Sequence, residues 1–317
     1  MARVRYSHVF TGSLAFSPIC RSWGVSTTIE DNPYKFASTD KVADIYWNTN
    51  AEAARKIKAA VAQLSNCINA GNCTDELPNL DLCTQPSGIV DWAALLHGVI
   101  IEQYSSIPQL DIAGFNFTAL INATIAAKTP AEVLRIPIDL APAVYNPSHT
   151  GCVDWAKIAG EGNIVADIGL GTSWLYMTCN WMINSLGAIS PSNSLFPEWA
   201  VDVSYPGCDT TLHADWVGPD MTKTNAEFEA MYGITDEELD KVTNLLIVNG
   251  SKDRTAAICS PKLSSSTNRS HSRVIEVWDM AHGDSGLSER LLPKGFHTQV
   301  DAIRNTQLAY IQEWLNL

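Results

Sequence analysis

The sequence predicts a doubly wound α/β fold, in which a mostly parallel sheet is interrupted in sequence by a helical insertion. Two observations support this class. Short apolar runs that suit buried strands lie near both ends of the chain, and an alanine-rich block of helical periodicity separates them. The carboxyl-terminal part also runs strand, turn, strand, helix, which is typical of the end of such a sheet. We therefore expect sheet segments at residues 1–35 and 161–317 and a helical cap at 36–160.

The first strand is expected within residues 11–19, a short apolar segment closed by a proline. The helical block contains two segments with strong amphipathic spacing, at residues 50–68 and 91–104. A weaker third helix is expected at residues 122–134. Loop-rich stretches with proline, glycine and asparagine border these helices.

Two further helices are expected before the end of the sheet, at residues 172–186 and 235–242. Strands follow at residues 244–250 and 272–280, which are the richest runs of β-branched residues in the chain. A last helix at residues 298–315 closes the sequence. Its inward face is expected to carry Val300, Ile303, Ile311 and Trp314.

Composition and charge exclude several classes of partner. The 317 residues are 46% apolar, which is enough to build one large domain or two ordinary ones. With 21 basic and 34 acidic residues the net charge is −13, so nucleic acid is not expected as a partner because its phosphates would be repelled. The most apolar long window, residues 88–101, is interrupted by Asp91 and His97 and is shorter than the ~20 residues of a bilayer span. We expect no membrane partner.

Polar residues follow each of the two late strands. The apolar run 245–248 is followed by Asn249-Gly250, which we expect to form a turn, and then by Asp253. The next strand leads to His282, whose neighbours are small. Because the carboxyl ends of parallel strands face one crevice, we expect these side chains to meet. An Asp, then a His, then a final helix matches the last two members of a Ser–Asp–His order, in which the carboxylate orients the imidazole and the imidazole takes the serine proton.

Structural roles compete with this interpretation. An Asp after Asn-Gly-Ser is commonly a turn or cap residue, and a His near a strand end is commonly an ordinary surface or core residue. Asp279 and Asp284 flank His282 and are rival partners, although both suit local capping of the loop. His297 is a rival base, although its place before the last helix suits a capping role.

The nucleophile is not assigned within this chain. A nucleophile elbow requires a G-x-S-x-G sequence, and none occurs here. Ser13 and Ser17 lie beside the first strand, without the flanking glycines or the following helix of an elbow. Ser173 follows two glycines that form neither an elbow nor a dinucleotide fingerprint. We expect all three serines to be structural.

Cysteine content indicates an oxidising compartment. Eight cysteines without a close CxxC pair favour disulfides over a zinc site, and we expect no metal and no other cofactor. The first residues contain no apolar segment of the length that an export signal needs, so we expect that signal upstream. Sequons for N-linked glycosylation occur at Asn72, Asn116, Asn122, Asn249 and Asn268.

Four segments, in order along the chain, resemble the serine peptidase family that includes lysosomal Pro-X carboxypeptidase and dipeptidyl-peptidase II. Residues 6–19, "YSHVFTGSLAFSPI", are similar to its "YPhlfdGalASSAPv" segment, and residues 172–180, "TSWLYMTCN", to its "W-x-x-Q-T-C" segment. Residues 244–253, "NLLIVNGSKD", resemble its strand and catalytic Asp in "N-G-x-x-D-P-W". Residues 280–287, "MAHGDSGL", resemble its "A-H" and catalytic His.

The resemblance implies part of an α/β-hydrolase sheet with an inserted helical cap, and an exopeptidase that cuts peptides next to proline, of either the carboxypeptidase or the dipeptidyl-peptidase type. Asp253 and His282 take the catalytic positions. The family's serine lies in a "G-G-S-Y-G-G" turn that would fall shortly before Met1, so we expect no activity from this chain alone. The alternatives are a non-catalytic binding protein of the same fold and an esterase.

Cleavage after proline requires a pocket that accepts its ring, and aromatic walls suit such a pocket, so Trp174, Trp181 and Trp278 are candidates, with ordinary core packing as the alternative for each. The resemblance adds Met177 to this candidate pocket. Met177 stands where the family has Gln, and Arg254-Thr255 replaces Pro-Trp, so we expect an altered pocket.

Disulfides implied by the resemblance join Cys179 to Cys208 and Cys83 to Cys152. A secreted, lysosomal or vacuolar location is expected, with peptides as substrates. A homodimer stays open as an alternative to a monomer.

Overall fold

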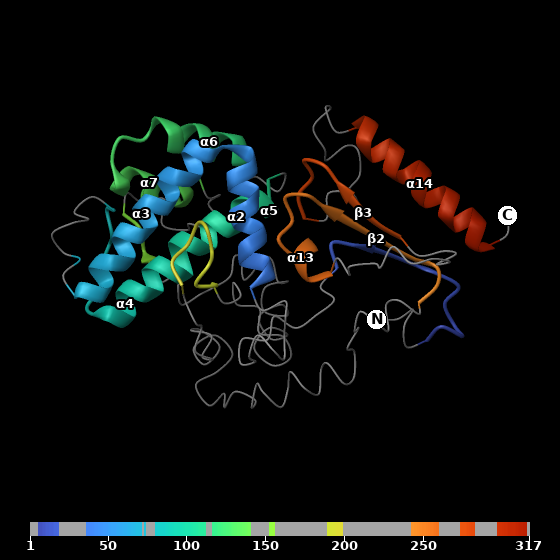
Figure 1. The fold of residues 1–317 in the computed structure, drawn as a ribbon, viewed down its shortest axis with the longest axis horizontal. Coiled ribbons are helices and arrows are strands. Elements are labelled where there is room, and N and C mark those ends of the chain that lie inside the picture. Colours follow the sequence, from blue (N-terminus) through green and yellow to red (C-terminus); the bar gives the residue numbers. More distant parts are fainter. Residues whose placement is uncertain are drawn as a thin grey trace. The chain divides into compact units, whose positions relative to one another are not determined.

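The chain divides into two compact units. In this computed structural model the described residues are 6–18, 36–71, 73, 80–111, 116–140, 152–155, 189–198, 242–259, 273–282 and 297–315. One unit combines Met1–Ser22 with Asn225–Leu317, and the other is Trp23–Thr224 (Figure 1). The predicted cap, 36–160, lies within the second unit. Its end at residue 160 stays a prediction, because residues 156–188 lie outside the described part of the chain.

The first unit contains a parallel sheet of three strands, β1 (Ser13–Phe16), β2 (Leu245–Gly250) and β3 (Arg273–Val277), in that spatial order. The central strand β2 is almost continuously apolar and buried, as expected for a strand covered on both faces. A short helix, α13 (Ala256–Cys259), follows β2. Mixed α/β structure with a parallel sheet was predicted and is present.

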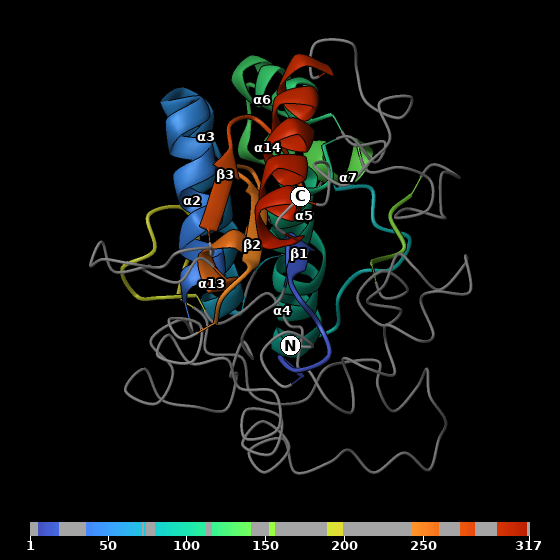
Figure 2. The same cartoon turned by 90° about the vertical axis from the view of Figure 1, so that its right-hand side faces the viewer.

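The last helix, α14 (His297–Leu315), lies along one face of this sheet in both views (Figures 1 and 2). Val300 and Ile303 are buried, as the sequence pattern predicts. Trp314 lies against Gly12, where an added Cβ would be 2.4 Å from the indole ring. A glycine at this position therefore allows the end of α14 to pack beside the start of β1.

Seven described helical segments form most of the second unit. They are α2 (Ala37–Thr49), α3 (Ala51–Ala70), α4 (Ile89–Ala93), the π-helix η1 (Ala94–Ile101), α5 (Glu102–Gln109), α6 (Phe117–Ala126) and α7 (Pro130–Asp139). The long helix α3 begins at the side-chain cap of Asn50 and ends at Gly71, whose φ of 70° is the left-handed conformation common at helix ends. Its apolar stripe faces the core of this unit.

The single helix predicted at residues 122–134 is wrong in extent, because the structure contains two helices there. Asn116 caps the start of α6, six residues earlier than predicted. The segment then breaks at Thr129, whose side chain forms a capping box with Glu132 ahead of α7. Pro130 occupies the first turn of α7, where its missing N–H has no consequence.

The helix predicted at residues 91–104 contains a π-helical segment at its centre. His97 lies in η1 and is buried, with 7% of its surface exposed. Burial disfavours the charged imidazolium and lowers the pKa of His97 to about 3. None of the described helices, including this apolar one, has the length and hydropathy needed to cross a bilayer.

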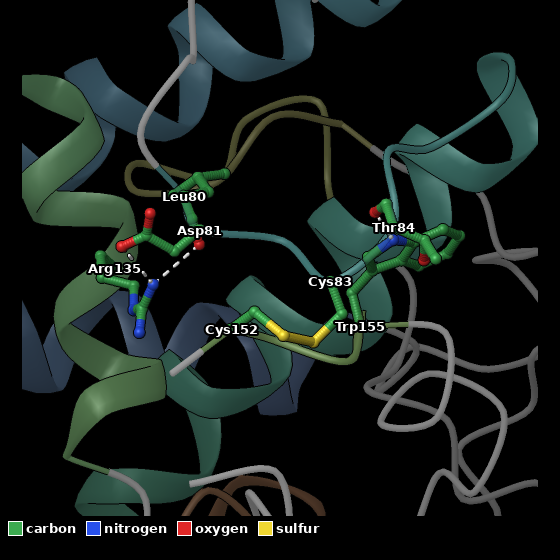
Figure 3. Close-up of a disulfide and its surroundings, with 7 residues drawn as sticks. All are labelled: Leu80, Asp81, Cys83, Thr84, Arg135, Cys152 and Trp155. Atoms are coloured by element: carbon green, nitrogen blue, oxygen red, sulfur yellow. Dashed lines mark hydrogen bonds and ion pairs between the residues drawn. A yellow bond between two sulfur atoms is a disulfide. The ribbon is translucent and has the colours of Figure 1, made fainter. Parts of the chain in front are cut away.

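Two disulfides hold the described part of the second unit. The expected bond between Cys83 and Cys152 is present (Figure 3). Beside it the indole N–H of Trp155 donates to the backbone carbonyl of Thr84 at 2.8 Å. Two segments far apart in sequence are thus joined by a covalent bond and a hydrogen bond.

The second disulfide, which the sequence did not assign, joins Cys67 to Cys73 at the end of α3. Cys179 and Cys208 lie outside the described residues, so their pairing stays a prediction.

Removing the Cys83–Cys152 bond by Cys83→Ala with Cys152→Ala should lower the free energy of unfolding of the second unit by about 4 kcal/mol, because the closed loop is long. The sequence separation is 69 residues, against 6 for Cys67–Cys73. The matched control, Cys67→Ala with Cys73→Ala, should cost only about 2 kcal/mol. Urea unfolding followed by circular dichroism measures both, and equal losses would contradict the loop-length argument.

His97 should make the second unit less stable in acid. Its pKa is 6.5 when unfolded and about 3 when folded, so only the unfolded chain binds a proton between these values. The free energy of unfolding should therefore fall by about 1.4 kcal/mol for each pH unit below 6.5. Denaturant titrations at pH 6.5 and 5 measure this slope. His97→Leu should reduce the slope by about that amount, and an unchanged slope would refute the assignment.

Candidate active site

Asp253 and His282 meet at one edge of the parallel sheet. Asp253 follows the end of β2, and His282 follows the end of the neighbouring strand β3. The Oδ2 atom of Asp253 lies 3.0 Å from the Nδ1 atom of His282, within hydrogen-bonding distance. The expected meeting of these two side chains is confirmed by this contact.

The Asp253 carboxylate is fully buried, with 0% of its side chain exposed. Burial alone would raise its pKa, but hydrogen bonds and charge from His282 and hydrogen bonding from Thr255 outweigh burial and lower the pKa of Asp253. The backbone N–H and the hydroxyl of Thr255 donate to Oδ1 at 2.9 and 2.7 Å. The carboxylate is therefore ionised and held on both oxygens.

The imidazole of His282 is accessible where the carboxylate is not, since 35% of its side chain is exposed. An ionised carboxylate accepts a hydrogen bond, so Nδ1 carries the proton that it donates to Asp253. The neutral ring then has its lone pair on Nε2, and this atom can take a proton. This pairing of a buried orienting group with an accessible base suits proton transfer.

A close backbone approach brings the two loops together. A Cβ added at Gly250 would lie 2.2 Å from the carbonyl oxygen of Met280 and 2.4 Å from that of Ala281. The N–H of Lys252 donates to the Met280 carbonyl at 2.9 Å, and the N–H of Ser251 donates to that of Val277 at 2.9 Å. The loop after β3 is thus held against the end of β2.

The turn predicted at Asn249-Gly250 is two residues too early. Both residues belong to β2 and lie opposite Glu276 and Val277 of β3. The turn begins at Ser251. Pairing with β3 keeps the chain extended through Gly250, because the small glycine lets the neighbouring loop approach.

Three residues are the alternatives to the Asp253–His282 pair, namely Asp279 and Asp284 as partners of His282 and His297 as the base. The Asp279 carboxylate forms an ion pair with Nζ of Lys252 at 2.8 Å, and its backbone φ is 61°. It therefore joins the two loops. Asp284 lies outside the described residues, and His297 is the first residue of α14.

The remaining predicted site residues are more scattered. Ser13 begins β1, and Ser17 is a buried residue directly after that strand. Trp278 is 75% exposed and so does not form the wall of a closed pocket within the described residues. The residues Ser173, Trp174, Met177 and Trp181 lie outside the described part of the chain.

The predicted glycosylation sites differ in how far their asparagine side chains are exposed to solvent. Asn122 is exposed on α6, and Asn116 is exposed and uses its side-chain oxygen to cap that helix. Asn249 is fully buried in β2, and a glycan there would displace the packed sheet, so the prediction for Asn249 is wrong. Asn72 and Asn268 lie outside the described residues.

Gly250 and Thr255 were missed as site residues. A glycine directly after a buried apolar run can indicate close backbone approach, and this pattern was interpreted as a turn. Thr255 is two residues after Asp253, at the spacing of an Asx-turn contact. Both signals are local and weak, because the spacing is common in loops that carry no site.

Among the described residues, no group of three or more His, Cys, Asp or Glu side chains is arranged to hold a metal ion. A scan against protein-family models gives no match, and a search of curated proteins gives no significant match.

Gly250→Ala should separate Asp253 from His282, because the new methyl group would overlap the Met280 carbonyl. We expect the hydrogen-bonded Nδ1–H resonance of His282 to disappear from the NMR spectrum and the free energy of unfolding to fall by about 1–3 kcal/mol.

Gly71→Ala is the control, because its Cβ would meet no atom within 4 Å and only the left-handed φ is disfavoured. Retention of the His282 resonance in Gly250→Ala would show that the close approach does not position the base.

Proposed function

We propose that Asp253 and His282 are the orienting carboxylate and the general base of a Ser–His–Asp triad in a serine hydrolase of the α/β-hydrolase fold. The observation that carries the proposal is the hydrogen bond between a buried carboxylate and an accessible imidazole at the ends of adjacent parallel strands. The order of Asp, His and a final helix along the chain supports it.

In this mechanism Asp253 keeps the Nδ1 proton of His282 in place, so Nε2 can accept the proton of a serine hydroxyl as the serine oxygen attacks a carbonyl carbon. The imidazolium that forms is stabilised by the ionised carboxylate. It then gives its proton to the leaving amine as the amide bond breaks, which leaves the acyl group bonded to the serine oxygen. Water attacks this ester while His282 takes a proton from the water, and His282 then returns the proton to the serine oxygen as the acid product leaves. The serine belongs, in this proposal, to a segment of the full-length protein outside these 317 residues.

Peptides cut next to proline are the proposed substrates. This step rests on the four-segment resemblance to the family of Pro-X carboxypeptidase and dipeptidyl-peptidase II, in which Asp253 and His282 take the catalytic positions. Two disulfides support a secreted, lysosomal or vacuolar location, because such bonds persist in oxidising compartments.

The full-length protein from its natural source should react with a fluorophosphonate probe, and peptide mapping should place the label on a serine outside residues 1–317. His282→Ala should abolish labelling, whereas His8→Ala at an exposed position should not. Asp253→Asn should lower kcat/KM on a proline-containing peptide by roughly 10³–10⁴-fold. A label on a serine of this chain, or labelling that survives His282→Ala, would refute the triad.

The same assays separate the alternatives. Release of a carboxyl-terminal residue identifies a carboxypeptidase, and release of an amino-terminal dipeptide identifies a dipeptidyl-peptidase. Turnover of acyl esters without preference for proline would identify an esterase. Absence of both labelling and turnover would favour a binding protein that has lost the chemistry.

A further inference from the structure

The hydroxyl of Thr255 lies within reach of both members of the Asp–His pair. Its Oγ1 atom is 2.7 Å from Oδ1 of Asp253 and 3.4 Å from Nδ1 of His282. Nδ1 is in turn 3.0 Å from the other carboxylate oxygen, Oδ2. Carboxylate, hydroxyl and imidazole therefore form a closed set of three contacts, in which Thr255 touches both partners.

The direction of the Thr255 proton follows from these distances. A hydroxyl has one proton, so it can donate to only one of the two neighbours. The contact to the carboxylate is the shorter one, and an ionised acceptor forms the stronger hydrogen bond. The proton is therefore donated to Asp253, which leaves a lone pair of Oγ1 for the Nδ1–H group of His282. That group has Oδ2 as its main acceptor and Oγ1 as a second, more distant one.

The surroundings of Thr255 restrict where its hydroxyl can lie. The residue is buried, with 1% of its surface exposed, and it directly precedes α13. Its N–H donates to Oδ1 of Asp253 at 2.9 Å, and its carbonyl accepts from the N–H of Ile258 at 3.1 Å. Because a β-branched side chain has few χ1 rotamers, this fixed backbone also limits the position of Oγ1.

We infer that Thr255 is a positioning residue, which fixes the Asp253 carboxylate through Oδ1 and gives the Nδ1 proton of His282 a second acceptor. Both contacts favour the ring form with its proton on Nδ1, and so they keep the lone pair of the neutral imidazole on Nε2. Thr255 acts through the pair, and its effect on catalysis rests on the proposed function. The competing explanation is a turn in which only the Thr255 N–H matters.

Thr255→Val separates these two roles, because valine has a similar shape and keeps the backbone N–H of the turn but lacks the hydroxyl. The measurement is the solvent-exchange rate of the His282 Nδ1 proton, followed by NMR on the full 317-residue chain. We expect the rate to rise about fivefold, the factor that corresponds to one hydrogen bond. Thr255→Ser keeps the hydroxyl and should keep the wild-type rate.

Two controls distinguish positioning from a general loss of stability. The N–H of Lys252, which donates to the Met280 carbonyl in the same pair of loops, should exchange at the wild-type rate in Thr255→Val. Thr39→Val removes another buried hydroxyl, which donates to the Phe36 carbonyl in the helical unit, and should leave exchange at His282 unchanged.

Three results would overturn the inference. They are an unchanged His282 rate in Thr255→Val, an equal rise at the Lys252 N–H, and a rise of the same size in Thr255→Ser or Thr39→Val. The exchange rate does not depend on turnover, so this failure is distinguishable from failure of the proposed function.

Activity gives a second measurement. In an active full-length protein, Thr255→Val should lower kcat about fivefold with KM unchanged, because the hydroxyl contacts the pair and not the substrate. A full-length protein that takes no fluorophosphonate label and still shows the fivefold exchange effect would keep Thr255 as a positioning residue and remove the serine hydrolase assignment.

Discussion

The close approach of two loops at Gly250 determines the geometry of the site. The carbonyl oxygens of Met280 and Ala281 lie where a side chain at position 250 would begin, so only glycine allows this contact without movement. Parallel pairing of β2 with β3 brings the strand ends together, but it does not specify how the loops beyond them run. The Lys252 to Met280 backbone hydrogen bond uses the space that glycine leaves. His282 follows two residues later and reaches Asp253.

Burial of the Asp253 charge gives the site its asymmetry. A fully buried carboxylate is unfavourable unless donors replace the water that it loses, and here His282 and Thr255 supply donors to both oxygens. Because the carboxylate is enclosed and the imidazole is partly exposed, only the imidazole can exchange protons with a bound molecule. Burial therefore separates the two roles, with Asp253 as the orienting carboxylate and His282 as the group that exchanges protons.

Sequence patterns predicted what depends on periodicity and chain order. The three strands and α14 were found within a few residues, because continuous apolar runs and helical spacing are local signals. The Asp–His pairing followed from the rule that parallel strand ends share one edge. The π-helical segment around His97 could not be predicted, because its residues have the same apolar periodicity as an α-helix. The sequence shows a glycine at position 250, but its role depends on a contact with the loop after β3, which the sequence does not show.

The contacts of the Asp–His site are close in sequence, whereas the pairing of β1 with β2 is distant in sequence. β2, β3, Asp253 and His282 all lie between residues 245 and 282, so their contacts require closure of only a short loop. In sequence, the helical unit lies between β1 and β2. The hydrogen bond that the Asn244 side-chain amide donates to the Thr11 carbonyl therefore spans 233 residues. Contacts of such high sequence separation are the slow ones to form in folding. The Asp–His pair can therefore assemble locally, whereas the sheet beside it is complete only when β1 has docked against β2.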